Sequence, residues 1–185
     1  SLFELVTFDT GIPEFAQQLV QECASHGINP ADVDWWGDPA GDIRDQQKQS
    51  AFQLLAAEGI LAKPAPTNDP SIRIATVQHV LTKLIGSRPQ LKLNPSLRWL
   101  RDAFIFGYRY RKRRTADPND YEERPDKNFA GGRYTHVMDA LQYALLGMGL
   151  GFRLMGARKA DVIHLNRSQR KYNPMGQHKA RVRRW

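Results

Sequence analysis

The chain has 185 residues and a formal net charge of +8, with 27 Lys and Arg against 19 Asp and Glu. Hydrophobic residues make up 41% and charged residues 25%, which are ordinary values for a globular protein and exclude a wholly disordered chain. No apolar run approaches the about 20 residues of a membrane span. The single cysteine, Cys23, excludes a disulfide framework and a cysteine zinc cluster. No signal-like segment opens the sequence, so we expect a cytoplasmic protein.

Strands and helices are predicted to alternate along the chain. Composition and apolar spacing predict strands at 2–8, 33–37, 60–63, 90–93 and 108–113. Helical spacing and breakers predict helices between a cap at Thr10 and Gly27, and at 45–58, 72–85, 95–104 and 134–150. The polar segment 115–132 is predicted to be a long loop. This alternation predicts an α/β fold, a sheet covered by helices, in which ligands bind at the carboxyl ends of strands.

The positive charge is concentrated at the carboxyl end. Up to Phe152 there are 17 basic and 18 acidic residues, and the remaining residues include 10 basic and one acidic. We therefore predict a domain over residues 1–152 and a basic, flexible tail over residues 153–185. A second basic cluster lies inside the domain and consists of Arg109, Arg111, Lys112, Arg113 and Arg114. Both features are typical of polyanion binding, and a solvated surface is the alternative interpretation.

Carboxylates are the candidate functional groups, because the sequence has no Walker A loop, HExxH, GxSxG or Cys/His metal spacing. Asp38 directly follows the predicted strand 33–37, within a turn shaped by Gly37, Pro39 and Gly41. A carboxylate at the carboxyl end of a strand lies where α/β folds place their sites. The alternative role for Asp38 is to cap the following turn.

Asp139 is the second candidate. It lies one helical turn after His136 and one before Tyr143, so these three side chains share a flank of the predicted helix. Oxygen-only carboxylate sites suit Mg²⁺ or Mn²⁺, and two such ions about 4 Å apart would support phosphodiester hydrolysis. The alternative roles are stabilisation of the helix dipole by Asp139 and capping or hydrogen bonding by His136.

Two longer runs contain these residues. The run WGDPAG at 36–41, and the run KN at 127–128 followed by THVMDALQYALLG at 135–147, resemble the second and third acidic motifs of the nuclease domain of tailed-phage large terminase subunits. The order of elements between the two motifs is also similar, and the resemblance covers roughly residues 2–150. It implies an RNase H-like fold, a mixed sheet flanked by helices, that cuts concatemeric double-stranded viral DNA during genome packaging in the host cytoplasm.

The resemblance also implies residue roles. Asp38 and Asp139 would be catalytic and would bind two Mg²⁺ or Mn²⁺ ions, and Lys127 and His136 would contact DNA or position the ligands. From its charge, the cluster at 109–114 would lie at the DNA-facing edge. Expected partners are double-stranded DNA, the portal protein, the small terminase subunit and the ATPase domain of the same chain, and no membrane.

One motif of the family is missing. In the terminase family, the first acidic residue lies on the central strand of the sheet, in an Asp-x-Gly motif. Nothing ahead of Leu2 in this sequence supplies that residue. Glu4 is expected inside a strand and Asp9 in a turn. We therefore expect a fragment of a longer nuclease, lacking its first strands and the ATPase domain. Two of three carboxylates should bind ions weakly.

Two other functions remain open. The first is another RNase H-like nuclease, such as a Holliday-junction resolvase. The second is a non-catalytic DNA- or portal-binding module, in which the tail and the basic cluster act and the carboxylates are caps. A binding module would retain DNA with a steep salt dependence and without a metal requirement.

Overall fold

The computed structural model describes residues 3–43, 49–114, 117 and 119–151, without the side chain of Glu123. The chain divides into two units, Ser1–Met155 and Gly156–Trp185. The described helices and strands belong to the first unit. The predicted tail at 153–185 lies outside the described residues.

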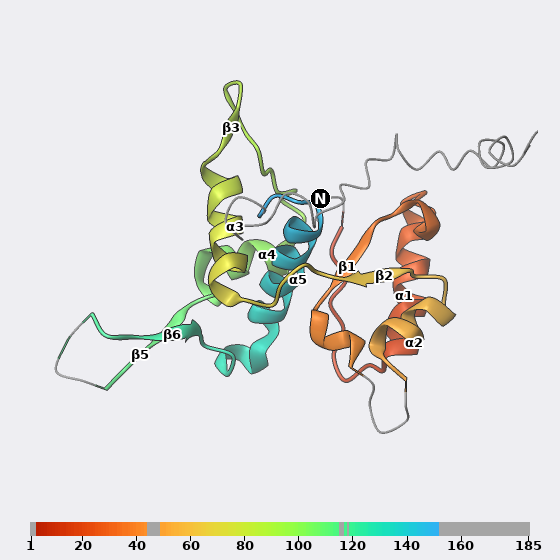
Figure 1. Cartoon of the computed structure of the whole chain (residues 1–185), viewed down its shortest axis with the longest axis horizontal. Coiled ribbons are helices and arrows are strands. Elements are labelled where there is room, and N and C mark those ends of the chain that lie inside the picture. The colour runs from red at the N-terminus through yellow and green to blue at the C-terminus, as the bar shows by residue number, and fades with distance from the viewer. Residues whose placement is uncertain (1–2, 44–48, 115–116, 118, 152–185) are drawn as a thin grey trace, which may run out of the picture. The chain divides into compact units, whose positions relative to one another are not determined.

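Helices make up most of the regular structure (Figure 1). The α-helices are α1 (Ile12–Ser25), α2 (Ala51–Ala57), α3 (Pro70–Thr82), α4 (Arg98–Asp102) and α5 (Arg133–Gly147). The shorter helices are η1 (Pro30–Asp32), η2 (Pro39–Asp42), η4 (Phe129–Gly132) and the π-helical turn η3 (Ala103–Gly107), which continues α4. Each predicted helix is present with shifted ends. Residues 44–48, at the start of the helix predicted at 45–58, lie outside the described residues.

The strands are short, and those described pair only in twos. The pairs are β1 (Trp35–Gly37) with β2 (Ala62–Pro64), β3 (Leu84–Ile85) with β4 (Arg88–Pro89), and β5 (Tyr110–Lys112) with β6 (Tyr121–Pro125). The first pair is parallel and the other two are antiparallel. The expected mixed α/β class is therefore confirmed. The described residues form three two-stranded sheets rather than one larger sheet.

The predicted strand at 2–8 is wrong for the described residues, because 3–8 form no strand pairing. Glu4 instead accepts hydrogen bonds from the N–H groups of Trp99 at 2.7 Å and Leu100 at 3.0 Å. It thus satisfies donors in the first turn of α4, which need a partner outside the helix. Asp9 does lie in a turn, with a φ of 52°. The cap of α1 is Gly11, whereas the Thr10 hydroxyl donates to the carbonyl of Phe8.

Two further predictions fail where local patterns mislead. Residues 90–93 are not a strand; the hairpin β3–β4 precedes them, closed by a turn in which Gly86 has a φ of +62°. The predicted loop at 115–132 contains β6 and η4. The YEERP sequence of β6 shows no alternation of apolar and polar residues, because this strand pairs with the exposed β5 away from the core.

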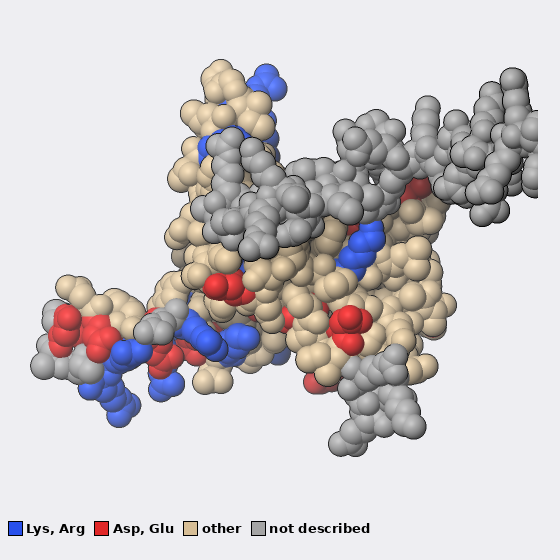
Figure 2. All heavy atoms as spheres, viewed as in Figure 1, with Lys and Arg blue, Asp and Glu red and all other residues tan. Residues whose placement is uncertain are grey.

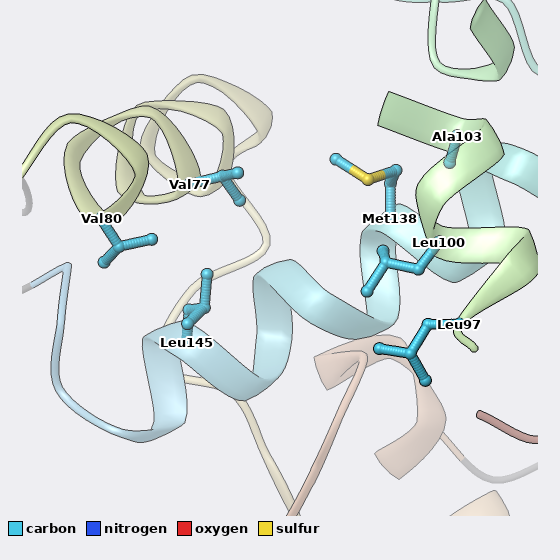
Figure 3. Packing of buried hydrophobic residues seen from close by; sticks show 7 residues of the cluster. All are labelled: Val77, Val80, Leu97, Leu100, Ala103, Met138 and Leu145. Carbon is cyan, nitrogen blue, oxygen red and sulfur yellow. The ribbon is translucent and has the colours of Figure 1, made fainter. Parts of the chain in front are cut away.

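α5 is the central element of the packing. It contacts α3, α4 and η3, and it also contacts β1 (Figure 1). Figure 3 shows the main core cluster, whose side chains come from α3, from α4 with its flanking residues, and from α5: Val77, Val80, Leu97, Leu100, Ala103, Met138 and Leu145. Burial of such side chains stabilises the fold by about 1.5–3 kcal/mol each. Within the described ranges, no helix combines the length and hydropathy needed to cross a membrane.

Candidate functional site

A cavity of about 340 Å³ contains both predicted carboxylates in its lining. The lining residues come from the turn after β1, the loop before α3 and its start, the residue after η3, the end of β6 with the loop that follows, and α5. They are Asp38, Asn68, Pro70, Arg73, Tyr108, Arg124, Pro125, Lys127, Thr135, Asp139 and Tyr143. Three of the residues singled out in the sequence, Asp38, Lys127 and Asp139, therefore lie around one space.

Asp38 reaches the cavity because β1 and β2 are parallel and in register. Gly37 pairs with Pro64, so the segments that follow both strands leave the sheet at the same edge. Asp38 is the N-cap residue of η2, and its Oδ1 accepts the N–H of Ala40 at 2.9 Å. The same Oδ1 accepts Nδ2 of Asn68, which follows β2, at 3.0 Å. Asp38 is thus both a cap and a cavity residue.

Asp139 faces the cavity from α5, with only 16% of its side chain exposed. Its Oδ1 lies 3.0 Å from Nη2 of Arg73. Burial raises the pKa of Asp139, and the charge of Asp38 raises it further. Arg73, Lys127 and His136 oppose this shift.

Arg73 is a central residue of this site that sequence reasoning missed. Only 7% of its side chain is exposed. Nη1 donates to Oδ1 of Asn68 at 3.2 Å and to the hydroxyl of Tyr143, and Cζ lies 4.7 Å from the centre of the Tyr143 ring. Its Nε is buried without a hydrogen-bond partner among the described residues. The available signal was a single arginine flanked by Ile72 and Ile74 in a helix with no other Lys, Arg, Asp or Glu, because a charge on an apolar helix face requires a partner.

Two tyrosines complete the polar wall. Burial raises the pKa of Tyr143, and the negative charge of the nearby Asp38 carboxylate adds to the shift. The Tyr143 hydroxyl therefore stays protonated at neutral pH, and it donates to Oδ1 of Asn68 at 2.7 Å. Burial also raises the pKa of Tyr108, whose hydroxyl accepts Nε2 of Gln142 at 3.0 Å.

His136 lies at a different cavity. Its side chain lines a space of about 470 Å³ together with residues of the 5–9 segment and Arg133. His136 lies one turn before Asp139 on α5. The two side chains nevertheless line different cavities. When it carries a proton, His136 lowers the pKa of Asp139.

The basic cluster at 109–114 lies on and around β5, and its residues are exposed. None of them belongs to the described lining of the carboxylate cavity, although the preceding residue, Tyr108, does. Arg109 is stacked 3.6 Å from the ring centre of Phe129, and Arg113 lies 3.7 Å from Asp120. Figure 2 shows basic and acidic side chains mixed on the β5–β6 hairpin. Arg124 and Lys127, at the base of this hairpin, are the basic residues that connect it to the cavity.

The donor atoms fit a hard divalent cation. Asp38 and Asp139 offer carboxylate oxygens, which suit Mg²⁺ or Mn²⁺, and Mg²⁺ is commonly held by one or two carboxylates with several waters. Asn68 Oδ1 already accepts hydrogen bonds from Arg73 and Tyr143. Among the described residues, no three Asp, Glu, His or Cys side chains are grouped closely enough to hold a metal ion together.

Comparison with known proteins finds no family model, no curated protein and no solved structure that matches this chain.

Proposed function

We propose that this chain is the metal-dependent nuclease portion of a phage terminase large subunit, with an RNase H-like fold. It would cleave concatemeric double-stranded DNA in the host cytoplasm, together with the portal protein, the small terminase subunit and the ATPase domain of the same chain. The observation that carries the proposal is the shared cavity of Asp38 and Asp139. The resemblance of the two segments that contain them to terminase acidic motifs gives independent support.

The proposed chemistry divides between the metal and the side chains. A bound Mg²⁺ or Mn²⁺ would lower the pKa of a coordinated water and neutralise charge on the phosphodiester. Asp38 and Asp139 would hold the ion through their carboxylate oxygens. Arg124 and Lys127 attract the DNA phosphate to the same cavity, because their positive charges lie at its lining. Tyr143, which remains protonated, holds Asn68 in place against Asp38.

DNA would approach along the β5–β6 hairpin. The exposed cations of the basic cluster continue from Arg124 and Lys127 along this hairpin. Cations that neutralise phosphates supply most of the sequence-independent affinity for DNA. His136, which lines the neighbouring cavity, would contact DNA or influence the site only from that side.

Plasmid cleavage in Mn²⁺ tests this function. The chain, or the same chain extended at its amino end, should nick and linearise plasmid DNA in Mn²⁺ and be inactive in EDTA. Asp139→Ala and Asp38→Ala should abolish cleavage, because each removes an ion ligand. Asp102→Asn, which changes an ion-paired carboxylate outside the cavity, should cleave normally. Undiminished cleavage by Asp139→Ala would rule out the mechanism.

A non-catalytic DNA-binding module is the second candidate. It is favoured by the capping bond from Ala40 to Asp38 and by the ion pair of Asp139 with Arg73, since both contacts give the carboxylates structural roles. Such a module should retain DNA equally in EDTA and Mn²⁺, with affinity falling steeply as salt rises. Deleting residues 157–185 should then weaken binding strongly, and unchanged retention would show that the tail does not bind DNA.

A further inference from the structure

We propose that Arg73 is a positioning residue that holds Asp139 and, through Asn68, Asp38 in the arrangement that receives the divalent ion. This inference rests on the function proposed above and identifies the residues that prepare the metal site.

A continuous chain of hydrogen bonds joins the two carboxylates. Nη2 of Arg73 lies 3.0 Å from Oδ1 of Asp139, and Nη1 lies 3.2 Å from Oδ1 of Asn68. Nδ2 of Asn68 then donates to Oδ1 of Asp38 at 3.0 Å. The two carboxylates come from the N-cap position of η2 and from α5, whereas the linking side chains come from α3 and the loop before it. The network therefore sets the positions of two groups that no single element holds together.

A guanidinium is suited to this task. Its planar fork of donors reaches Asp139 with one nitrogen and Asn68 and Tyr143 with the other. The contacts with Asn68 and Tyr143, including stacking over the Tyr143 ring, hold Arg73 independently of Asp139. A lysine would keep the positive charge but would offer a single nitrogen in place of the fork.

The cost of burying Arg73 argues for more than a packing role. The side chain is 7% exposed, and its buried Nε has no partner among the described residues. Burying a charge and leaving a donor without a partner both cost free energy, and well-packed apolar residues are often as good as a buried ion pair for stability. Carboxylates that bind metals are commonly oriented by such outer hydrogen bonds, and losing one typically lowers metal affinity about 10–100-fold.

Direct Mn²⁺ binding to the whole chain, without DNA, tests the inference. Electron paramagnetic resonance measures the free Mn²⁺, and the melting temperature in EDTA is recorded for each variant. Arg73→Lys and Arg73→Met should both weaken Mn²⁺ binding about 10-fold or more. Asn68→Ala should also weaken binding with little change in melting temperature, because Asn68 is exposed. The matched control is Asn94→Ala, an exposed asparagine that caps a distant turn, and it should bind Mn²⁺ like the wild type.

Chemical rescue separates positioning from general stability. Arg73→Ala leaves space for a guanidinium ion, so millimolar guanidinium should restore part of its Mn²⁺ binding, whereas the same concentration of NaCl should not.

Each alternative outcome is distinct. Wild-type affinity in Arg73→Lys would show that only the charge matters, and tighter binding in Arg73→Met would show that Arg73 competes with the ion; either result overturns the inference. If Asp139→Asn binds Mn²⁺ as well as the wild type, the metal site itself is absent, and the proposed function fails together with this inference. If Arg73→Met does not fold, Arg73→Lys and Asn68→Ala still decide the question.

Discussion

Gly147, at the end of α5, packs directly against the indole ring of Trp36 on β1, where a side-chain carbon on residue 147 would overlap the ring. This contact fixes α5 against the β1–β2 pair. Asp38 follows Trp36 by two residues, and Asp139 precedes Gly147 by about two helical turns. The separation of the two carboxylates therefore depends on how closely α5 and β1 approach.

Replacing Gly147 by alanine should destabilise the protein. Replacing an exposed glycine in a helix by alanine usually stabilises the protein by about 1 kcal/mol. At this position the methyl group would overlap Trp36, and we expect a loss of about 1–3 kcal/mol in the free energy of unfolding. Urea denaturation measures it. Gly41→Ala, where the added carbon would make ordinary contacts with Phe52 and Ala51, should be nearly neutral. Equal stabilities of the two variants would contradict the close approach.

Removing the cap of α2 should cost about 1 kcal/mol. The Ser50 hydroxyl accepts the N–H of Gln53 at 3.2 Å, and the Gln53 side chain accepts the N–H of Ser50 at 2.9 Å, which is a complete capping box. Ser50 is only 2% exposed, so water cannot replace the lost bond. Thermal unfolding of Ser50→Ala should therefore show a lower melting temperature. Ser96→Ala, at an exposed serine, should not change it.

Stability in EDTA should depend on the ionisation of Asp139. Burial raises the pKa of this carboxyl above its ordinary 3.8, so the folded state binds the proton more tightly than the unfolded state does. The stability that the protonated Asp139 contributes to the folded state is therefore complete below pH 3.8, and it is lost as the pH rises through the pKa of the folded state. Asp139→Asn does not titrate, so its stability relative to the wild type should rise with pH over this range, in addition to a pH-independent cost of leaving the buried Arg73 without its carboxylate partner.

Urea titrations between pH 3.5 and about 8 measure this difference, which follows from the linkage of proton binding to folding. Asp102→Asn, outside the cavity, is the control for the loss of a carboxylate in general. A difference between Asp139→Asn and the wild type that does not vary with pH would contradict the assignment.

DNA affinity should depend on the exposed cations of the β5–β6 hairpin. In the triple variant Arg111→Ala, Lys112→Ala and Arg114→Ala, the slope of log affinity against log salt should fall by about 0.9 for each lost phosphate contact. Arg109 and Arg113 are left unchanged because they are engaged with Phe129 and Asp120. Fluorescence anisotropy with a short duplex at several salt concentrations measures the slope.

The control removes the same charge elsewhere. Arg88, Lys92 and Arg98 are exposed and lie in or near β4 and α4. Replacing these three by alanine should weaken DNA binding much less than the hairpin variant does. An equal effect would mean that the net charge, rather than the hairpin, attracts the DNA.

Local patterns predicted the helices well and the strands less well. The helices have apolar residues at helical spacing, and Gly27 ends α1 with a φ of +66°, as expected of a helix-terminating glycine. These signals act within a few residues of each other and are visible in the sequence. A strand, by contrast, needs a partner, and the segment at 3–8 has strand composition but finds no partner strand among the described residues.

The sequence by itself determined the α/β class, an apolar-faced helix predicted at 134–150 and observed as α5, and the choice of Asp38 and Asp139 as candidate residues, because these follow from spacing and short motifs. Only the tertiary structure decided that the two carboxylates share a cavity, that His136 lies at another, and that Arg73 and Asn68 connect the pair. The physical reason is that a buried charge has no local preference for its partner. The packing of α3 against α5 and of α5 against β1 determines which side chains surround Arg73. This packing depends on the whole fold and cannot be read from a short stretch of sequence.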